Sequence, residues 1–208
     1  MHFPLWNKQR GIPKAYTRLI QYNDSLFIGT SFMPKEISVE LMNLKTEKVV
    51  NSVNFPLKPK EGEYSRPYEC KIATEMNFIV AAYRYINRLE IYKLSDQKFQ
   101  LNTIIGDANN QYDLYRLNKD NEMILHYSDI VCGKNQIYAL YRGVKEKELS
   151  SANSKIEVYS YDGTHLRTFD LGRSIEKILV DESSMRIYAF DRNEEKDIVC
   201  CYAIESNT

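Results

Sequence analysis

The stretch LEIYKLSDQK, residues 89–98, decides the fold, because its pattern returns at three other places along the chain. Apolar and polar residues alternate in it, which is typical of a half-buried strand, and SDQ has the composition of a hairpin turn. It aligns without gaps with VELMNLKTEK (39–48) and IEVYSYDGTH (156–165). VCCYAIESNT (199–208) is a fourth copy, with Cys200 in place of the glutamate. We therefore expect four equivalent strands, each followed by a turn.

A second repeated block precedes each copy. Its members LFIGTSF, NFIVAAY, QIYALYR and RIYAFDR are aligned on Phe27, Phe78, Ile137 and Ile187. Two residues later a column of small side chains follows, namely Gly29, Val80, Ala139 and Ala189. Further apolar stretches flank both blocks, so each unit contains four strands joined by turns and loops. Four antiparallel strands that recur every ~50 residues are typical of a β-propeller blade.

The sequence thus predicts an all-β protein, a propeller built of four-stranded antiparallel blades, with four repeats in this chain. The blade units lie at about 17–57, 67–105, 125–171 and 175–208, in a single domain or propeller fragment over 1–208. HFPL near the start matches NFPL at 54–57, so residues 1–5 look like the remnant of an outer strand. Two interpretations stay open: a closed four-bladed ring, or four blades of a larger propeller.

Composition excludes several classes of protein. The 28 basic and 28 acidic residues give a formal net charge of zero, which argues against nucleic-acid and anionic-membrane partners. No apolar run is long enough for a transmembrane segment, and the N-terminal residues lack the pattern of a signal peptide. The four cysteines lack the spacing of a zinc ligand set, so we expect no metal site and no cofactor.

The segments YECKIATEMNFIVAAYRYINRLEIYKLSDQK and IYALYRG…IEVYSYDGTHLRTFDL resemble the bacterial TolB-like six-bladed β-propeller proteins. The resemblance covers nearly all of 18–204, and its motifs belong to the scaffold rather than to a catalytic site. It implies that the four units are part of a six-bladed propeller. It also implies an exported protein, periplasmic or a lipoprotein, of a family whose members commonly have no known function.

A ligand site is expected at one mouth of the propeller, where two sets of loops meet and where tyrosine and arginine are frequent. Arginine presents a planar fork to carboxylate or phosphate, and tyrosine offers a ring face with a polar tip. These residues would suit a polyanionic, sugar-like or peptide ligand, or they are ordinary rim residues. The candidate ligand-binding residues are Tyr64, Arg66, Arg84, Tyr85, Tyr112, Arg116 and Arg142.

Catalytic patterns are weak. His126 and Asp129 could act together as a general base in catalysis. No nucleophile motif accompanies them, so a structural histidine is the preferred interpretation. The loop 106–123 carries acidic and amide residues without the order of a Ca²⁺ loop. The repeated glutamates Glu40, Glu90 and Glu157 are expected to face solvent or to be charge partners between blades.

The leading hypothesis is a non-catalytic binding scaffold with an unknown protein, peptide or glycan ligand at the channel mouth. The alternative is a lactonase- or lyase-like propeller enzyme with a metal on the central axis. The enzyme hypothesis requires acidic or amide side chains at equivalent inner-strand positions. The column at these positions reads Gln21, Ile72, Val131 and Asp181. Two of its four members are apolar, which argues against an axial metal. Self-association through open blade edges is a third possibility.

Overall fold

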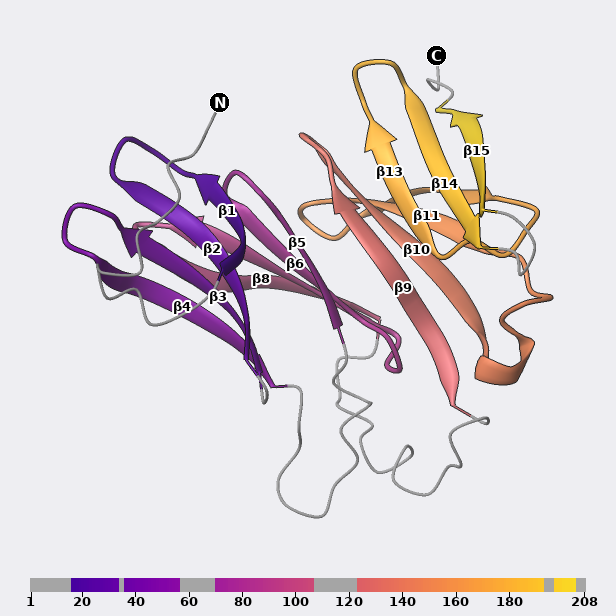
Figure 1. The fold of residues 1–208 in the computed structure, drawn as a ribbon, viewed down its shortest axis with the longest axis horizontal. Coiled ribbons are helices and arrows are strands. Elements are labelled where there is room, and N and C mark those ends of the chain that lie inside the picture. The colour runs from indigo at the N-terminus through magenta and orange to yellow at the C-terminus, as the bar shows by residue number, and fades with distance from the viewer. Residues whose placement is uncertain (1–15, 34–35, 57–69, 107–122, 193–196, 205–208) are drawn as a thin grey trace.

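The computed structural model describes residues 16–33, 36–56, 70–106, 123–192 and 197–204. They form four antiparallel sheets, which we number as blades 1 to 4 (Figure 1). Blade 1 contains β1 (Tyr16–Gln21), β2 (Leu26–Met33), β3 (Glu36–Asn43) and β4 (Lys48–Pro56). Blade 2 contains β5 (Cys70–Glu75), β6 (Phe78–Tyr83), β7 (Arg88–Ser95) and β8 (Lys98–Gly106).

Blade 3 contains β9 (Ile124–Cys132), β10 (Gln136–Lys145), the short 3₁₀ helix η4 (Glu146–Glu148), β11 (Lys155–Ser160) and β12 (His165–Asp170). Blade 4 contains β13 (Lys177–Asp181), β14 (Arg186–Arg192) and β15 (Asp197–Ala203). Within each sheet the strands follow chain order. The prediction of repeated four-stranded blades is therefore confirmed for blades 1 to 3, and blade 4 has three strands among its described residues. Residues 1–5 lie outside the described part of the chain.

The predicted turns form through local side-chain chemistry. Asp96 and Gln97 both have positive φ angles, of 50° and 59°, as a two-residue hairpin turn between paired Ser95 and Lys98 requires. In blade 1 the Asn43 side-chain oxygen accepts hydrogen bonds from the backbone N–H groups of Lys45 and Thr46. Such Asn and Asp turns explain why the hairpins could be located from the sequence.

The register of the strands corrects one column of the repeat. Gly29 lies opposite Glu40, Ala139 opposite Glu157 and Ala189 opposite Cys200. In blade 2, however, Ala81 and not Val80 lies opposite Glu90. The alignment on Phe78 was therefore wrong by one residue. The cause is the tight β5–β6 turn, in which Glu75 pairs directly with Phe78 and Met76 takes a positive φ.

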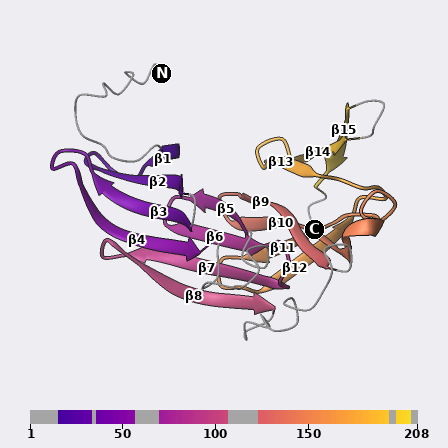
Figure 2. The ribbon, with the colours of Figure 1, turned by 60° about the horizontal axis from the view of Figure 1, so that its bottom comes forward.

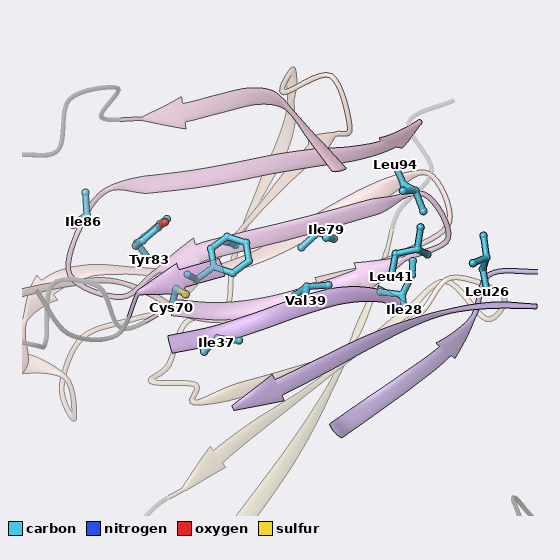
Figure 3. Close-up of a cluster of buried hydrophobic side chains, with 12 residues drawn as sticks. Leu26, Ile28, Ile37, Val39, Leu41, Cys70, Ile79, Tyr83, Ile86 and Leu94 are labelled. Atoms are coloured by element: carbon cyan, nitrogen blue, oxygen red, sulfur yellow. The ribbon is translucent and has the colours of Figure 1, made fainter. Parts of the chain in front are cut away.

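Three apolar clusters lie at the three junctions between consecutive blades. At the first junction, Ile28, Val39 and Leu41 of blade 1 pack with Ile79 and Leu94 of blade 2 (Figure 3). The second cluster joins blades 2 and 3, and the third joins blades 3 and 4. We call the face of a blade that contacts the next blade its forward face, and the opposite one its backward face. This core of small and branched side chains is typical of close-packed sheets.

The glutamate column was predicted to face solvent or the space between blades, and the solvent-facing alternative is wrong for Glu40 and Glu90, while Glu157 is half-buried. Glu40 is 3% exposed and Glu90 is 7% exposed. Glu90 lies on the face of blade 2 that packs against blade 1, since it is paired with Ala81 of the first cluster, but the hydroxyl partners of both glutamates are tyrosines of the same blade. Glu40 accepts a hydrogen bond from the hydroxyl of Tyr16 (2.5 Å), and Glu90 accepts one from Tyr92 (2.8 Å). Burial is tolerated because the carboxylates are satisfied.

The four sheets form an open arc, as Figures 1 and 2 show. Blade 1 lies at one end of the arc and blade 4 at the other, so the described sheets do not pack into a closed four-bladed ring. We call the first strand of each blade its inner strand. The inner strand β5 contacts β9, and β9 contacts β13, so these three strands lie side by side. In the described part of the chain, no helix is long and apolar enough to cross a membrane.

Candidate ligand-binding site

A cavity of about 450 Å³ lies where the inner strands β5, β9 and β13 approach one another. Strands β6, β10 and β14 end at the same edge, because they run antiparallel to the inner strands. This edge is the mouth at which the sequence predicts ligand binding. The side chains that line the cavity come from blades 2, 3 and 4, and they are Lys71, Arg84, Leu125, Ser128, Asp129, Arg142, Leu149, Ser150, Ser174, Glu176, Lys177 and Asp191.

Three of the charged residues occupy the same position on three consecutive inner strands. Each lies one residue before the inner-strand residue that pairs with the small side chain of the second strand, which is Ala81, Ala139 or Ala189. The three are Lys71, Asp129 and Lys177. We call these three residues the inner row. Arg18 holds the equivalent position in β1, where it pairs with Thr30. The repeat thus presents a charged residue from each blade at this level of the inner strands.

Asp129 is the acidic member of the inner row. Its Oδ2 accepts the backbone N–H of Ile178 on the neighbouring blade at 3.0 Å. Burial raises the pKa of the Asp129 carboxyl above its usual value, while backbone hydrogen bonds, Lys71 and Lys177 act in the opposite direction. The carboxylate therefore joins blade 3 to blade 4 and draws both lysines electrostatically to one place.

Arg142 is buried and also lines the cavity. Its guanidinium donates to the carbonyl oxygens of Ile175 (2.6 Å) and Leu149 (2.5 Å) and to Ser174 Oγ (2.8 Å). Burial lowers the pKa of Arg142, and the neighbouring Glu176 and Asp191 favour its charged form. The arginine thus ties the loop after η4 to the connection that enters blade 4.

The structure brings three of the predicted site residues to this region. Arg84 and Arg142 line the cavity. Tyr85 is buried beside them, its hydroxyl donates to Glu146 Oε1 at 2.5 Å, and its ring centre lies 5.5 Å from the Arg84 guanidinium carbon. The other four candidates, Tyr64, Arg66, Tyr112 and Arg116, lie outside the described residues.

Sequence reasoning missed most of the cavity, including Lys71 and Lys177 of the inner row, and considered Asp129 only as a partner of His126. The inner-strand column compared in the sequence does not occupy equivalent positions, since its members pair with different repeat positions of β2, β6, β10 and β14; it consists of Gln21, Ile72, Val131 and Asp181. Asp181 instead caps a turn, and hydrogen bonds from Ser183 and Ser184 lower its pKa to about 2. The argument that this column gave against an axial metal therefore fails.

The other catalytic and metal candidates do not assemble into a site. The His126 ring packs against Tyr141, with centroids 5.9 Å apart, and its backbone N–H donates to the Arg84 carbonyl oxygen. His165 lies on the outermost strand β12, where its Nε2 contacts Thr168 Oγ1 at 2.9 Å. Among the described residues, no three His, Cys, Asp or Glu side chains are grouped closely enough to hold a metal ion. Most of the loop 106–123 is not described.

Solved structures with a similar fold are propellers and related proteins with very different sequences. The WD40 domain of Toxoplasma gondii coronin shares 8% identity with a TM-score of 0.50, over 90% of this chain and 45% of that one. BamB from Moraxella catarrhalis shares 9% identity with a TM-score of 0.44, over 82% of this chain and 38% of that one. Myxococcus xanthus glutaminyl cyclase shares 8% identity with a TM-score of 0.40, over 85% of this chain and 61% of that one. The chain spans less than two thirds of each of these proteins.

No curated protein matches the sequence. A protein family does match it, described as TolB-like 6-blade propeller-like, and the match extends over residues 7–183. That range includes blades 1 to 3 and the inner strand of blade 4, in agreement with the resemblance found in the repeat motifs. The chain therefore belongs to the TolB-like 6-blade propeller-like family.

Proposed function

We propose that this protein is a non-catalytic binding scaffold whose ligand occupies the cavity at the mouth. The observation that carries the proposal is the cavity itself, since three blades of one repeat converge on it with charged and hydroxyl side chains. A concave site with a few convergent polar groups is the usual form of a small-ligand site. The ligand class we propose is a peptide, a protein segment or a glycan.

The state of the polar groups supports binding rather than catalysis. Arg142 is held by three acceptors, and Asp129 accepts a backbone N–H, so both are fixed as parts of the scaffold. Ser128 Oγ makes a long contact, 3.5 Å, with the carbonyl oxygen of Leu140. No histidine or cysteine is among the described residues that line the cavity.

The test is a binding screen with peptide and glycan arrays, using the protein and a variant with a filled cavity. Ser150→Trp places a large ring at an exposed position of the cavity wall. Ser52→Trp, exposed on the outermost strand β4, is the matched control. We expect array hits that Ser150→Trp abolishes and Ser52→Trp retains. Hits that survive in Ser150→Trp would place binding elsewhere and contradict the proposal.

We also propose that copies of this chain self-associate through blade 4. The exposed large apolar side chains Leu179, Phe190 and Val199 lie on its described strands. Contiguous apolar surface of this kind is typical of interaction sites. Sizing chromatography with light scattering should report a dimer or larger species at micromolar concentration, and a monomer at every concentration would refute self-association.

Export is a further part of the proposal, and it rests on membership of the TolB-like family alone. Fractionation of the native cells, with antibody detection, would test it. We expect the protein in the periplasmic or membrane-associated fraction. Recovery only with cytoplasmic markers would contradict export.

A further inference from the structure

Six of the seven charged residues that line the cavity form two sets of opposite net sign, and Arg84 is a further cation of the lining. The inner row contributes two lysines and one aspartate, so this set carries one excess positive charge. Arg142, Glu176 and Asp191 form the second set, which carries one excess negative charge. Both sets face one cavity of about 450 Å³.

In the positive set the two lysines are available to a ligand. Lys71 and Lys177 are exposed, and within the described chain neither ammonium group is hydrogen-bonded. Asp129 attracts both of them, but it also accepts the backbone N–H of Ile178. One carboxylate cannot neutralise two ammonium groups, so an anionic ligand group would complete this set.

In the negative set the carboxylates are the available groups. The guanidinium hydrogens of Arg142 go to two carbonyl oxygens and a serine hydroxyl, so Arg142 acts on the carboxylates only at a distance. Glu176 is exposed and accepts no hydrogen bond from a described residue. Asp191 has one loose ion pair, 3.9 Å from Arg173. A cationic or hydrogen-donating ligand group would be bound here.

We propose that the cavity binds a small zwitterion, with its carboxylate between Lys71 and Lys177 and its ammonium group against Glu176 and Asp191. This inference rests on the proposed binding function and names its ligand class as a free amino acid or a short peptide with free termini. The side chains of Leu125 and Leu149 also line the cavity and would contact the apolar part of such a ligand. The volume lies within the usual range for small-ligand sites, ~300–1,000 Å³.

Four forms of one dipeptide test the charge pattern directly by isothermal titration calorimetry. These are Ala-Ala with both termini free, N-acetyl-Ala-Ala, Ala-Ala amide, and the doubly blocked N-acetyl-Ala-Ala amide. Each block removes one charge and leaves the rest of the ligand almost unchanged. We expect the free dipeptide to bind about tenfold more tightly than either singly blocked form, and the doubly blocked form to bind most weakly.

Two charge-removing variants connect each terminus to its own wall. Lys71→Gln should weaken binding of the free dipeptide about three- to tenfold and leave Ala-Ala amide unaffected, because the amide has no carboxylate. Glu176→Gln should do the reverse, with N-acetyl-Ala-Ala unaffected. Lys93→Gln, exposed on β7 and outside the cavity, is the control and should change nothing. All three positions are exposed, so we expect the variants to fold.

The outcomes separate this inference from the proposed function. Equal affinity for all four dipeptides, or no binding of the free dipeptide at millimolar concentration, would overturn the zwitterion inference. The binding function would still stand if array hits depended on Ser150. If Lys71→Gln weakened the free and the amidated dipeptide equally, the assignment of the carboxylate to the lysine pair would be wrong.

Discussion

Glu90 offers the sharpest test of how the repeat is stabilised. It is buried in blade 2 and accepts hydrogen bonds from two tyrosine hydroxyls, Tyr92 at 2.8 Å and Tyr83 at 3.2 Å. Arg88 also contacts it, with Nε at 2.8 Å and Nη2 at 2.6 Å. Glu90→Gln retains the size of the side chain and one acceptor oxygen, but it removes the negative charge.

We expect Glu90→Gln to lower the free energy of unfolding by about 2–4 kcal/mol. A hydrogen bond to a charged group contributes ~1.5–3 kcal/mol, and breaking a buried ion pair costs ~3–5 kcal/mol because a buried charge loses its counter-charge. The retained amide oxygen offsets part of that loss. The side chains of Arg88 and Glu90 are only 15% and 9% exposed, so solvent screening of this ion pair is weak.

The matched control is Glu157→Gln in blade 3. Glu157 also accepts hydrogen bonds from two tyrosines, Tyr159 at 2.8 Å and Tyr127 at 3.2 Å. It is more exposed than Glu90, and no arginine among the described residues donates to it. Its loss should be smaller, about 1–2 kcal/mol. Urea unfolding followed by circular dichroism measures both. Equal losses for the two variants would refute the assignment of the larger effect to Arg88.

Three further predictions concern packing, the cavity wall and pH. Gly29→Ala should lower the free energy of unfolding by about 1–3 kcal/mol in urea titrations, since an added Cβ would lie 2.6 Å from the Tyr16 ring and displace it from Glu40. Arg142→Leu removes three hydrogen bonds of a buried guanidinium, so we expect a loss of about 2–4 kcal/mol and faster amide hydrogen exchange near Ser174. Because its pKa is raised, the folded state favours the protonated form of Asp129 more than the unfolded state does. The stability that Asp129 contributes is therefore present at low pH, and it is lost as the pH rises from about 3.8 through the raised pKa. Asp129→Asn should therefore gain stability relative to the parent protein as the pH rises above about 4, and a difference independent of pH would contradict this.

The fold could be predicted because its determinants are local. Alternation marks each strand, Asn43 sets its hairpin through its own side chain, and Asp96 takes the positive φ that its two-residue turn requires. These signals repeat along the chain, so an error in one copy does not hide the pattern. The blade count and the antiparallel order then follow from the repeat.

The cavity could not be predicted, because it depends on register. A shift of one residue moves a side chain to the opposite face of a strand, and the tight turn at Met76 causes such a shift in blade 2. With the correct register, Lys71, Asp129 and Lys177 become one column. The burial of Glu40 and Glu90 was missed for a related reason, since it depends on tyrosines from other strands of the blade.

The forward face of blade 4 gives the last prediction. Phe190 and Val199 occupy the positions that Ala82 and Leu89 hold in blade 2. There the next blade covers them completely, with both at 0% exposure, whereas Phe190 is 41% exposed and Val199 is 56% exposed.

Covering such side chains contributes ~1.5–3 kcal/mol each when burial is complete, so association of copies through this face would stabilise the fold by several kcal/mol. The melting temperature should then rise with protein concentration, since association shifts unfolding by mass action. Phe190→Ser should abolish this dependence, whereas Leu101→Ser, exposed on β8, should retain it. A melting temperature that is the same at 1 and 100 μM would show that this face contributes nothing to association.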